Sequence, residues 1–494
     1  MEKVTSKKLL PWTKNDYILN IFVYAINVII FMLFYVATMS ITNREVSEVF
    51  SDAAQFINFV VLIVFIFAVM AVYFAFEDRN FLKSAVNSEM IFLIMELSYI
   101  VCFASGFYVN YYLRPLALVA LLTLFLTNTR TAVFVDVLFC MVLFLFDAFS
   151  GMKGMFENNI ISAAYFLVTG LTSSAVAIYF TKNVYSRIKL LALSFLISVP
   201  TVICVAIPTV SLGSNDWRAL LCAVASGPLS ASVCMILLPV LESFFKKVTC
   251  FKYAELTDHK AKLIKRLIEQ APGTFNHSMV VSNIAEACAT AIGVDPLLAR
   301  TCAYYHDVGK LRRPEMFKEN QTDGVNPHND LTPELSANII RSHTQDGYAL
   351  VMKNRLPKAV ADVCLEHHGT MPILYFYDKA KKFTDGDVDI LQFCYQGPKP
   401  KTTIAAIIMI ADASEAATRA LKDRSRENVL EVVRKIVNER MKLGQFEDCE
   451  ITLKEINVII NTVVNSLTGV YHSRIEYPKV SLDEIDITSS GEEE

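Results

Sequence analysis

The sequence predicts an all-α protein in which a polytopic helical membrane domain of about eight spans precedes an all-helical soluble domain. The chain of 494 residues is 53% hydrophobic and 19% charged, which makes it more apolar than ordinary soluble domains. The excess lies in the first half, where apolar runs from Tyr17 to about Phe245 are separated by short polar gaps. Charged residues return from about Lys246 onward, and there apolar residues recur at helical spacing with no competing strand pattern.

The domain limits follow from these changes in composition. We expect residues 1–16 to form a cytoplasmic N-terminus, 17–245 the transmembrane domain, 246–262 a linker, 253–476 the soluble domain and 477–494 a disordered acidic tail. A transmembrane helix needs about 20 apolar residues. Eight segments meet or approach this length, and the fourth is short because it ends at the polar "TNTR" turn. The expected spans are 17–40, 56–76, 90–110, 114–128, 131–149, 159–181, 190–211 and 217–245.

Flanking charges indicate the orientation of these spans. Lysine and arginine collect on the cytoplasmic side of membrane proteins, and a cytoplasmic N-terminus with eight spans leaves only Arg44, Arg114, Lys153 and Arg218 outside. We therefore expect a multi-pass cell-membrane protein, in contact with the lipid bilayer, whose soluble domain is cytoplasmic. The first apolar run has no convincing small-residue cleavage site and is expected to be a retained helix.

Some polar residues of the membrane half have no assigned role. Glu96 and Asp136 fall inside expected spans, where acids are either functional or hydrogen-bonded to Ser or Tyr inside the bundle. The eleven cysteines include no CxxC pair and none lies in an external loop. They are typical of small buried side chains in a reducing compartment, not of disulfides or a zinc ribbon.

Histidines concentrate in the soluble half, next to helix ends or in apolar helical context, and the apolar half has none. A lone histidine on a helix is usually structural, but several imidazoles and carboxylates in one small helical domain predict a metal site. Adjacent residues on a helix point about 100° apart, so two neighbours can both reach one cleft. The histidines concerned are His277, His306, His343, His367 and His368.

These ligand types favour iron, manganese or zinc, and the absence of nearby thiolate argues against a structural zinc site. The number of candidate ligands exceeds what one ion needs, which predicts two metals. In such pairs a carboxylate commonly bridges ions about 3.5–4 Å apart, and hydroxide attacks phosphorus in line with its leaving oxygen.

The segments "GTFNHS", "YYHDVGK" and "IMIADASEA" resemble the metal signature of the HD phosphohydrolase superfamily, and "IIRSHTQDG" and "LEHHGT" resemble its two-metal branch. Together with "RRPEMFKENQ", "NPHNDLTPELS", "YFYDKA" and "QGPKPKT", and with the membrane half upstream, the chain resembles the 7TM-HD cyclic di-AMP phosphodiesterases. The similarity is dense across about 253–425 and architectural across 1–250.

This resemblance implies a signalling enzyme that hydrolyses cyclic di-AMP to linear pApA with two divalent transition metal ions, iron or manganese. One ion would be held by His277, His306 and Asp412, and the other by His343, His367 and His368. Asp307 would bridge the ions and act in catalysis. Family members typically carry a large extracellular domain after the first span, and here that region is only a short loop.

The residues after the bridge are candidates for substrate contacts. Lys310 is expected to bind or stabilise a phosphate, or else to be a solvated lysine after a glycine break. Arg312 and Arg313 either steer the anionic substrate or form a surface patch. Thr274 and Asn276 are possible orienting residues beside His277, and His328 is better explained as a turn residue.

Three functions stay open at this point. The leading one is cyclic di-AMP hydrolysis, which the run "HHGTMPILYFY" favours because HD enzymes for cyclic di-GMP carry "DGxGYP" after the double histidine. The second is an HD hydrolase of another nucleotide, such as cyclic di-GMP or a guanosine polyphosphate. The third is a membrane receptor that binds nucleotide without cleaving it. We expect no nucleic-acid polymer among the partners, and a homodimer is compatible with the sequence.

Overall fold

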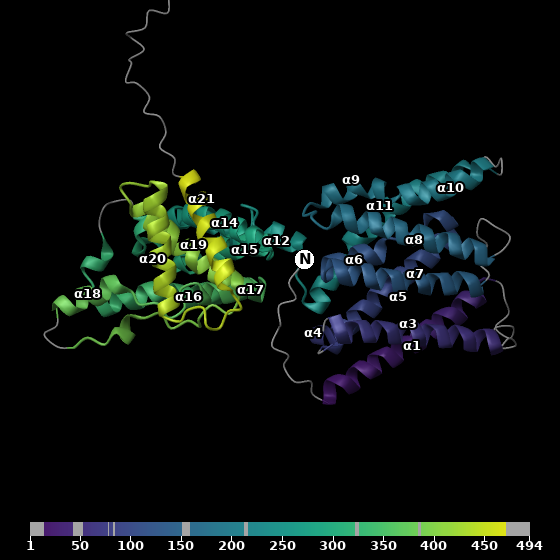
Figure 1. Ribbon diagram of the computed structural model, residues 1–494, viewed down its shortest axis with the longest axis horizontal. Helices are drawn as coiled ribbons and strands as arrows, with labels where there is room; N and C mark the ends of the chain where they lie inside the picture. Colours follow the sequence, from purple (N-terminus) through teal and green to yellow (C-terminus); the bar gives the residue numbers. More distant parts are fainter. Residues whose placement is uncertain are drawn as a thin grey trace, which may run out of the picture. The chain divides into compact units, whose positions relative to one another are not determined.

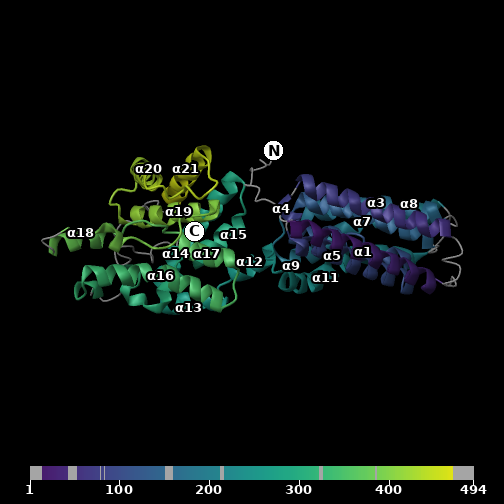
Figure 2. The same cartoon turned by 90° about the horizontal axis from the view of Figure 1, so that it is seen from below.

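The computed structural model describes residues 14–42, 53–77, 79–82, 84–150, 159–211, 216–321, 326–383 and 387–470. Within these ranges all regular structure is helical, and one isolated β-bridge joins Pro372 and Cys394. The predicted all-α class is therefore confirmed. The chain divides into two compact units, residues 1–255 and 256–494, drawn in Figures 1 and 2. The acidic tail expected at 477–494 lies outside the described residues.

The first unit is a bundle of long apolar helices (Figure 1). Seven are long and apolar enough to cross a membrane when α9 and α10, which adjoin at Ser198, are taken as one. Its elements are α1 (Lys14–Ile41), α3 (Ala53–Glu77), α4 (Arg79–Leu82), α5 (Ala85–Tyr108), η1 (Tyr111–Leu113), α6 (Leu118–Leu126), α7 (Thr129–Ser150), α8 (Asn159–Thr181), α9 (Arg187–Ile197), α10 (Val199–Ser211), α11 (Trp217–Phe245) and α12 (Cys250–Leu256).

The fourth expected span, 114–128, differs from the other seven because only the nine residues of α6 are α-helical. It nevertheless runs the length of α7. Arg114 Nη1 lies 2.6 Å from Asp147 Oδ2 near the end of α7, and α6 ends just before α7 begins. Along α7, the distance from Thr129 to Asp147 is about 27 Å at the helical rise per residue, so the segment from Arg114 to the end of α6 covers about that length. Non-helical backbone is tolerated at membrane depth when protein surrounds it, and α6 is almost entirely buried.

Contacts between helix ends agree with an even number of passes through the bundle. The start of α1, the end of α3, the start of α7, the end of α6 and the start of α12 are linked, so the bundle begins and ends on the same side. The contacts are Asn20 with Leu82, Glu77 with Arg130, and Phe125 with Phe251.

The structure buries four ionisable side chains inside this bundle, Arg114, Asp147, Asp136 and Glu96. Arg114, which begins the expected span 114–128 and is expected on the outer side, is only 2% exposed, pairs with Asp147 and is flanked by the ring of Tyr111. The local sequence gives no sign of this partner, which is 33 positions away on α7. Asp136 accepts a hydrogen bond from Ser174 at 2.8 Å, whereas Glu96 Oε1 has no hydrogen-bond partner among the described residues.

The second unit packs its helices around one main core to which α14, α15, α19 and α21 contribute apolar faces. Side-chain caps fix where several helices begin, because a side-chain oxygen satisfies the free N–H groups of a first turn. Asp295 caps α15, Thr332 caps α16 and Thr402 caps α19. The α-helices are α13 (Lys262–Gln270), α14 (Pro272–Ile292), α15 (Pro296–Tyr305), α16 (Pro333–Lys353), α17 (Lys358–Glu366), α18 (Leu374–Phe383), α19 (Thr403–Ala420), α20 (Arg426–Lys442) and α21 (Leu453–Val470).

Short 3-10 helices connect these elements beside the histidine-rich region. They are η2 (Val308–Arg312), η3 (Pro314–Met316), η4 (Lys318–Asn320), η5 (Pro327–Asn329) and η6 (Ile390–Phe393). The first of them, η2, packs on α16.

Candidate metal centre

Both adjacent pairs of candidate ligands stand at the carboxyl end of a helix. His306 is the residue at which α15 ends, and Asp307 precedes η2. His367 plays the same part at the end of α17. A glycine follows each pair closely. A side chain at Gly309 would clash with the backbone oxygen of His343, because its Cβ would lie 1.9 Å away. This close approach brings the segment that carries His306 and Asp307 next to His343 on α16.

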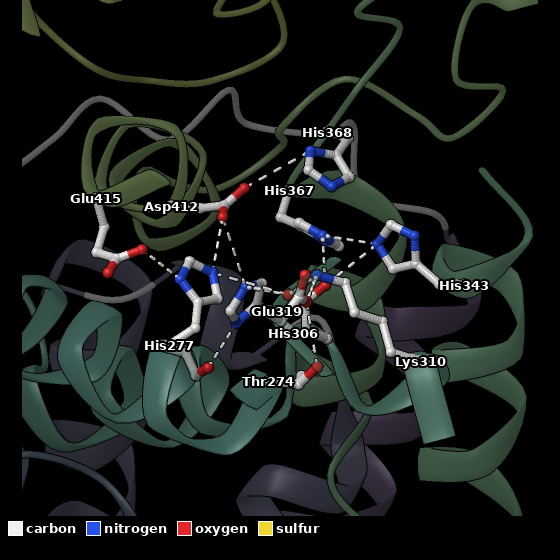
Figure 3. Close-up of polar contacts among 12 residues, drawn as sticks. Thr274, His277, His306, Lys310, Glu319, His343, His367, His368, Asp412 and Glu415 are labelled. Atoms are coloured by element: carbon white, nitrogen blue, oxygen red, sulfur yellow. Dashed lines mark hydrogen bonds and ion pairs between the residues drawn. The ribbon is translucent and has the colours of Figure 1, made fainter. Parts of the chain in front are cut away.

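Three further elements complete the cluster in Figure 3. His277 projects from the first half of α14, His343 from the middle of α16 and Asp412 from the middle of α19. The seven side chains predicted from the sequence are therefore brought into one buried site, and groups of them lie close enough to hold a metal ion. They are His277, His306, Asp307, His343, His367, His368 and Asp412.

The two oxygens of Asp307 face two different sets of imidazoles. Oδ2 lies 3.3 Å from His306 Nε2 and 3.8 Å from His277 Nε2. Oδ1 lies 3.3 Å from His343 Nε2 and 3.7 Å from His367 Nε2. This carboxylate therefore stands between two ligand sets, as a bridging ligand would.

Asp412 also reaches both sides of the cluster. Its Oδ1 is 3.0 Å from His277 Nε2 and 3.9 Å from His306 Nε2, whereas its Oδ2 is 3.7 Å from His368 Nδ1. The side chain of His368 is 24% exposed, the largest exposed fraction among these ligands. The site is therefore most accessible to solvent near His368.

Hydrogen bonds orient four of the imidazoles so that Nε2 points inward. Nδ1 of His306, His343 and His367 donates to a backbone oxygen of its own helix, at 2.6, 2.6 and 3.0 Å respectively. Nδ1 of His277 donates to Glu415 Oε2 at 2.6 Å. Metal-binding histidines almost always use the second ring nitrogen in this way.

Two buried atoms in the centre fit a metal site. Nε2 of His306 and Oδ1 of Asp307 have no hydrogen-bond partner among the described residues. Leaving buried polar atoms unpaired costs free energy, and a cation would satisfy both. The imidazole and carboxylate donors suit a divalent transition metal.

Charge interactions set the protonation of the site in the metal-free protein. Burial raises the pKa of Asp307, but Lys310 and His306 outweigh it and hold that pKa well below its usual range. Burial lowers the pKa of His277, and hydrogen bonds to Asp412 and Glu415 nevertheless raise it to about 9. Burial lowers the pKa of both His367 and His368. His277 therefore holds a proton more firmly than His367 and His368 do.

Lys310 is engaged by two carboxylates. Its Nζ lies 2.7 Å from Asp307 Oδ2 and 2.7 Å from Glu319 Oε1, and its side chain is 13% exposed. Thr274 donates to the same Glu319 oxygen at 3.2 Å, so it reaches the site through this network. The alternative of a solvated lysine is excluded.

The other flanking residues differ in exposure and in partners. Arg312 pairs with Asp346 and Arg313 is exposed, while Asn276 is exposed on α14. His328 is buried in η5, where Nε2 donates to Met316 O at 2.9 Å, which agrees with its assignment to a turn.

Sequence reasoning missed three residues that contact the ligands or Lys310. Glu415 stands three residues after Asp412, and this helical spacing could have identified it. Glu319, which binds Lys310, stands nine residues after it within the quoted segment "RRPEMFKENQ". Tyr395, whose ring stacks on His368 with centroids 4.3 Å apart, is distant in sequence from its partner. No local pattern marks Tyr395.

Comparison with known proteins agrees with the two-part architecture. Residues 18–249 match the family model described as "7TM receptor with intracellular HD hydrolase", and residues 274–417 match "HD domain". The Bacillus subtilis protein named cyclic-di-AMP phosphodiesterase PgpH is 34% identical over 86% of this chain and 59% of its own length. The protein of that name from Listeria monocytogenes is 44% identical over 49% of this chain and 33% of its own length.

Crystal structures of the L. monocytogenes PgpH HD domain also match. One is 45% identical and covers 43% of this chain and 99% of its own, with a TM-score of 0.41. Another, in complex with cyclic-di-AMP, is 44% identical over 44% of this chain and 100% of its own, with a TM-score of 0.42.

This chain spans less than two thirds of the length of both full-length relatives. The matches nevertheless cover both units in the same order, and an HD domain implies divalent metal binding. The chain belongs to the family of seven-transmembrane proteins with an intracellular HD hydrolase domain.

Proposed function

We propose that the protein is a membrane-bound phosphodiesterase that hydrolyses cyclic di-AMP to linear pApA at a two-metal centre. The observation that carries this proposal is the position of Asp307, whose two oxygens face two separate sets of imidazoles. A single ion would leave one of these sets unused. The names of the B. subtilis and L. monocytogenes relatives support the choice of substrate.

The proposed ligands divide around Asp307, which bridges. His277, His306 and Asp412 would hold one ion, and His343, His367 and His368 the other. Iron or manganese fits this set of nitrogen and oxygen donors. Two such ions would neutralise the phosphate and activate water as the nucleophile.

The reaction adds one water across one phosphodiester bond of the ring. A P–O bond to water forms, the bond from phosphorus to a ribose 3′ oxygen breaks, and that oxygen gains the proton, which leaves a 5′ phosphate. Lys310 keeps Asp307 ionised and in place through its 2.7 Å contact. In our proposal it also stabilises charge on a bound phosphate, while the exposed Arg313 contacts the substrate.

The orientation in the membrane is part of the same proposal. Even parity of the passes puts the start of α1 and the end of α11 on one side, and the lysines and arginines near these ends favour the cytoplasm. The HD domain, which we place at 253–476, would then meet its nucleotide inside the cell. The bilayer anchors the enzyme beside that face.

Hydrolysis of a different nucleotide is the main competing function. Cyclic di-GMP and guanosine polyphosphates would meet the same metal chemistry, so only contacts to the bases separate them. A receptor that binds without cleaving is less well supported, because all seven ligand positions keep His or Asp.

The test uses the full chain in detergent, loaded anaerobically with iron or manganese and given each nucleotide separately. We expect conversion of cyclic di-AMP to pApA, lost in His306→Ala and retained in the control His259→Ala, which changes an exposed histidine outside the ligand cluster. Cleavage of only another nucleotide would overturn the substrate assignment. Binding of cyclic di-AMP without cleavage by metal-loaded protein would support the receptor instead.

A further inference from the structure

His368 is held differently from the other histidines of the centre. The rings of His277, His306, His343 and His367 are each fixed by a hydrogen bond from Nδ1. His368 instead turns Nδ1 toward Asp412, and no hydrogen bond to its ring is found in the part of the chain that the structure describes. Something else must fix this ring, because a poorly oriented ligand weakens a metal site.

The backbone just after His368 is held by Gln445, which lies between α20 and α21. Gln445 is 1% exposed. Its Oε1 accepts the backbone N–H of Thr370 at 3.0 Å, and its Nε2 donates to Thr370 Oγ1 at 2.9 Å and to Leu443 O at 3.2 Å. The side-chain amide therefore makes three hydrogen bonds, two of them to the residue two positions after His368.

The geometry at Gly369 shows how closely Gln445 approaches this loop. Gly369 has φ +51°, and a Cβ there would lie 2.2 Å from Gln445 Oε1. Left-handed backbone turns the chain sharply after the double histidine, and only a residue without a side chain leaves room for the amide. Gln445 thus fills a space that the turn has opened for it.

The opposite side of the loop is held by the segment before α19. The backbone N–H of Tyr395 donates to Met371 O at 3.0 Å, and that of Ile373 donates to Phe393 O at 2.9 Å. These bonds set the ring of Tyr395 against His368 with an interplanar angle of 28°. The loop is therefore fixed from both sides, by Gln445 and by Tyr395.

We propose that Gln445 is a positioning residue for the second metal ion, acting through Thr370 on His368. Gln445 lies outside the segment 274–417 that matches the HD family model, so α20, α21 and their connection would form part of the metal-site scaffold. The inference rests on the two-metal arrangement of the proposed function. It requires no assumption about the nucleotide.

The test compares manganese binding by the full chain in detergent before and after Gln445→Leu. We expect the wild type to bind two ions and the variant to keep the first affinity while the second falls by about 10- to 100-fold, the usual range for residues that orient ligands. Gln445→Glu keeps the acceptor for the Thr370 N–H, so its affinity for the second ion should lie between those of the wild type and Gln445→Leu. Gln270→Leu, at an exposed glutamine of α13, is the matched control.

Metal per chain and the electron paramagnetic resonance signal of a coupled manganese pair are the readouts, and thermal unfolding of metal-free protein monitors the fold. The inference would be overturned if Gln445→Leu bound both ions with the affinities of the wild type. It would also be overturned if the variant lost affinity for both ions to the same extent. If that variant does not fold, Thr370→Val, which removes only the hydroxyl partner, should still weaken the second ion; unchanged binding there would also overturn it. A wild type that binds two ions but leaves cyclic di-AMP intact defeats the proposed function alone.

Discussion

Replacing Glu415 by Gln tests how the centre controls its own protonation. Glu415 is fully buried and accepts a hydrogen bond from Nδ1 of His277 at 2.6 Å. Together with Asp412 it raises the pKa of His277 to about 9, against the effect of burial. A metal ion binds only the neutral imidazole, so this proton must leave before His277 can act as a ligand.

The cost of removing that proton can be worked out. At pH 7 a pKa of about 9 leaves about 1% of His277 neutral, which is about 2.7 kcal/mol. The affinity for the first ion should therefore rise about tenfold per pH unit between pH 7 and 9. Since the folded pKa lies above the ordinary 6.5, protonated His277 stabilises the metal-free fold fully below about pH 6.5. That contribution is lost as pH rises through about 9.

Glu415→Gln has two opposite effects that pH separates. It removes a negative charge, so the pKa of His277 falls and proton competition weakens near pH 7. It also removes the strong acceptor that orients the ring and raises its basicity, which typically costs about 10- to 100-fold in affinity. The variant should bind the first ion clearly more weakly at pH 9, with a smaller difference at pH 7.

Manganese titration of the full chain by calorimetry at several pH values measures both effects. Repeating it in buffers of different ionisation enthalpy counts the released protons. The expected plot of log affinity against pH is flatter for the variant than for the wild type. Parallel lines would refute the role of Glu415 in holding the proton, and coincidence at pH 9 would refute its role in orienting the ring.

Three other changes have defined outcomes. Asp307→Asn removes the bridging carboxylate, so the rate of hydrolysis should fall by more than about 100-fold, the upper end of the loss typical for residues that only orient ligands. Bound manganese should drop below two ions per chain. Arg114→Met leaves Asp147 buried without its partner and should destabilise the membrane unit by about 3–5 kcal/mol; thermal unfolding in detergent should recover in part when Asp147→Leu is added. Chelation should lower the unfolding temperature of the HD domain alone, by the equivalent of about 2.7 kcal/mol if the free metal had been at 100 times its dissociation constant, as calorimetry would detect.

The ligands were predictable because their chemistry is written in short motifs. His306 with Asp307, and His367 with His368, are adjacent polar residues at helix ends, and the structure places both pairs in one site. Glu415 was within reach of the same reasoning because it is one helical turn from Asp412. Their assignment as metal ligands stays a prediction until metal is measured.

The residues that support the ligands were not predictable. Gln445 meets Thr370 across 75 positions of sequence, and only the packing of α20 and α21 creates that contact. The same holds in the membrane unit for Arg114, whose partner Asp147 is 33 positions away. A rule based on span length also cannot foresee α6, because a short helix suffices where neighbouring helices bury the remaining backbone.

The charges of the centre explain why cations and an anionic substrate fit the same place. Asp307, Asp412, Glu319 and Glu415 are carboxylates close together, and among the described residues Lys310 and Arg419 form ion pairs with them as permanent cations. Two negative charges are then left in a buried region, which is costly without counter-ions.

Protonated His277 offsets one of these charges in the metal-free protein, in agreement with its raised pKa. Two divalent ions would displace that proton and turn the local balance from two negative charges to two positive ones. The proposed substrate carries one negative charge on each of its two phosphodiesters, so it would restore neutrality. The carboxylates thus hold a proton on His277 when no metal is bound, and they hold the two ions when metal is bound. The metal-bound centre would then attract a cyclic dinucleotide more strongly than a neutral ligand.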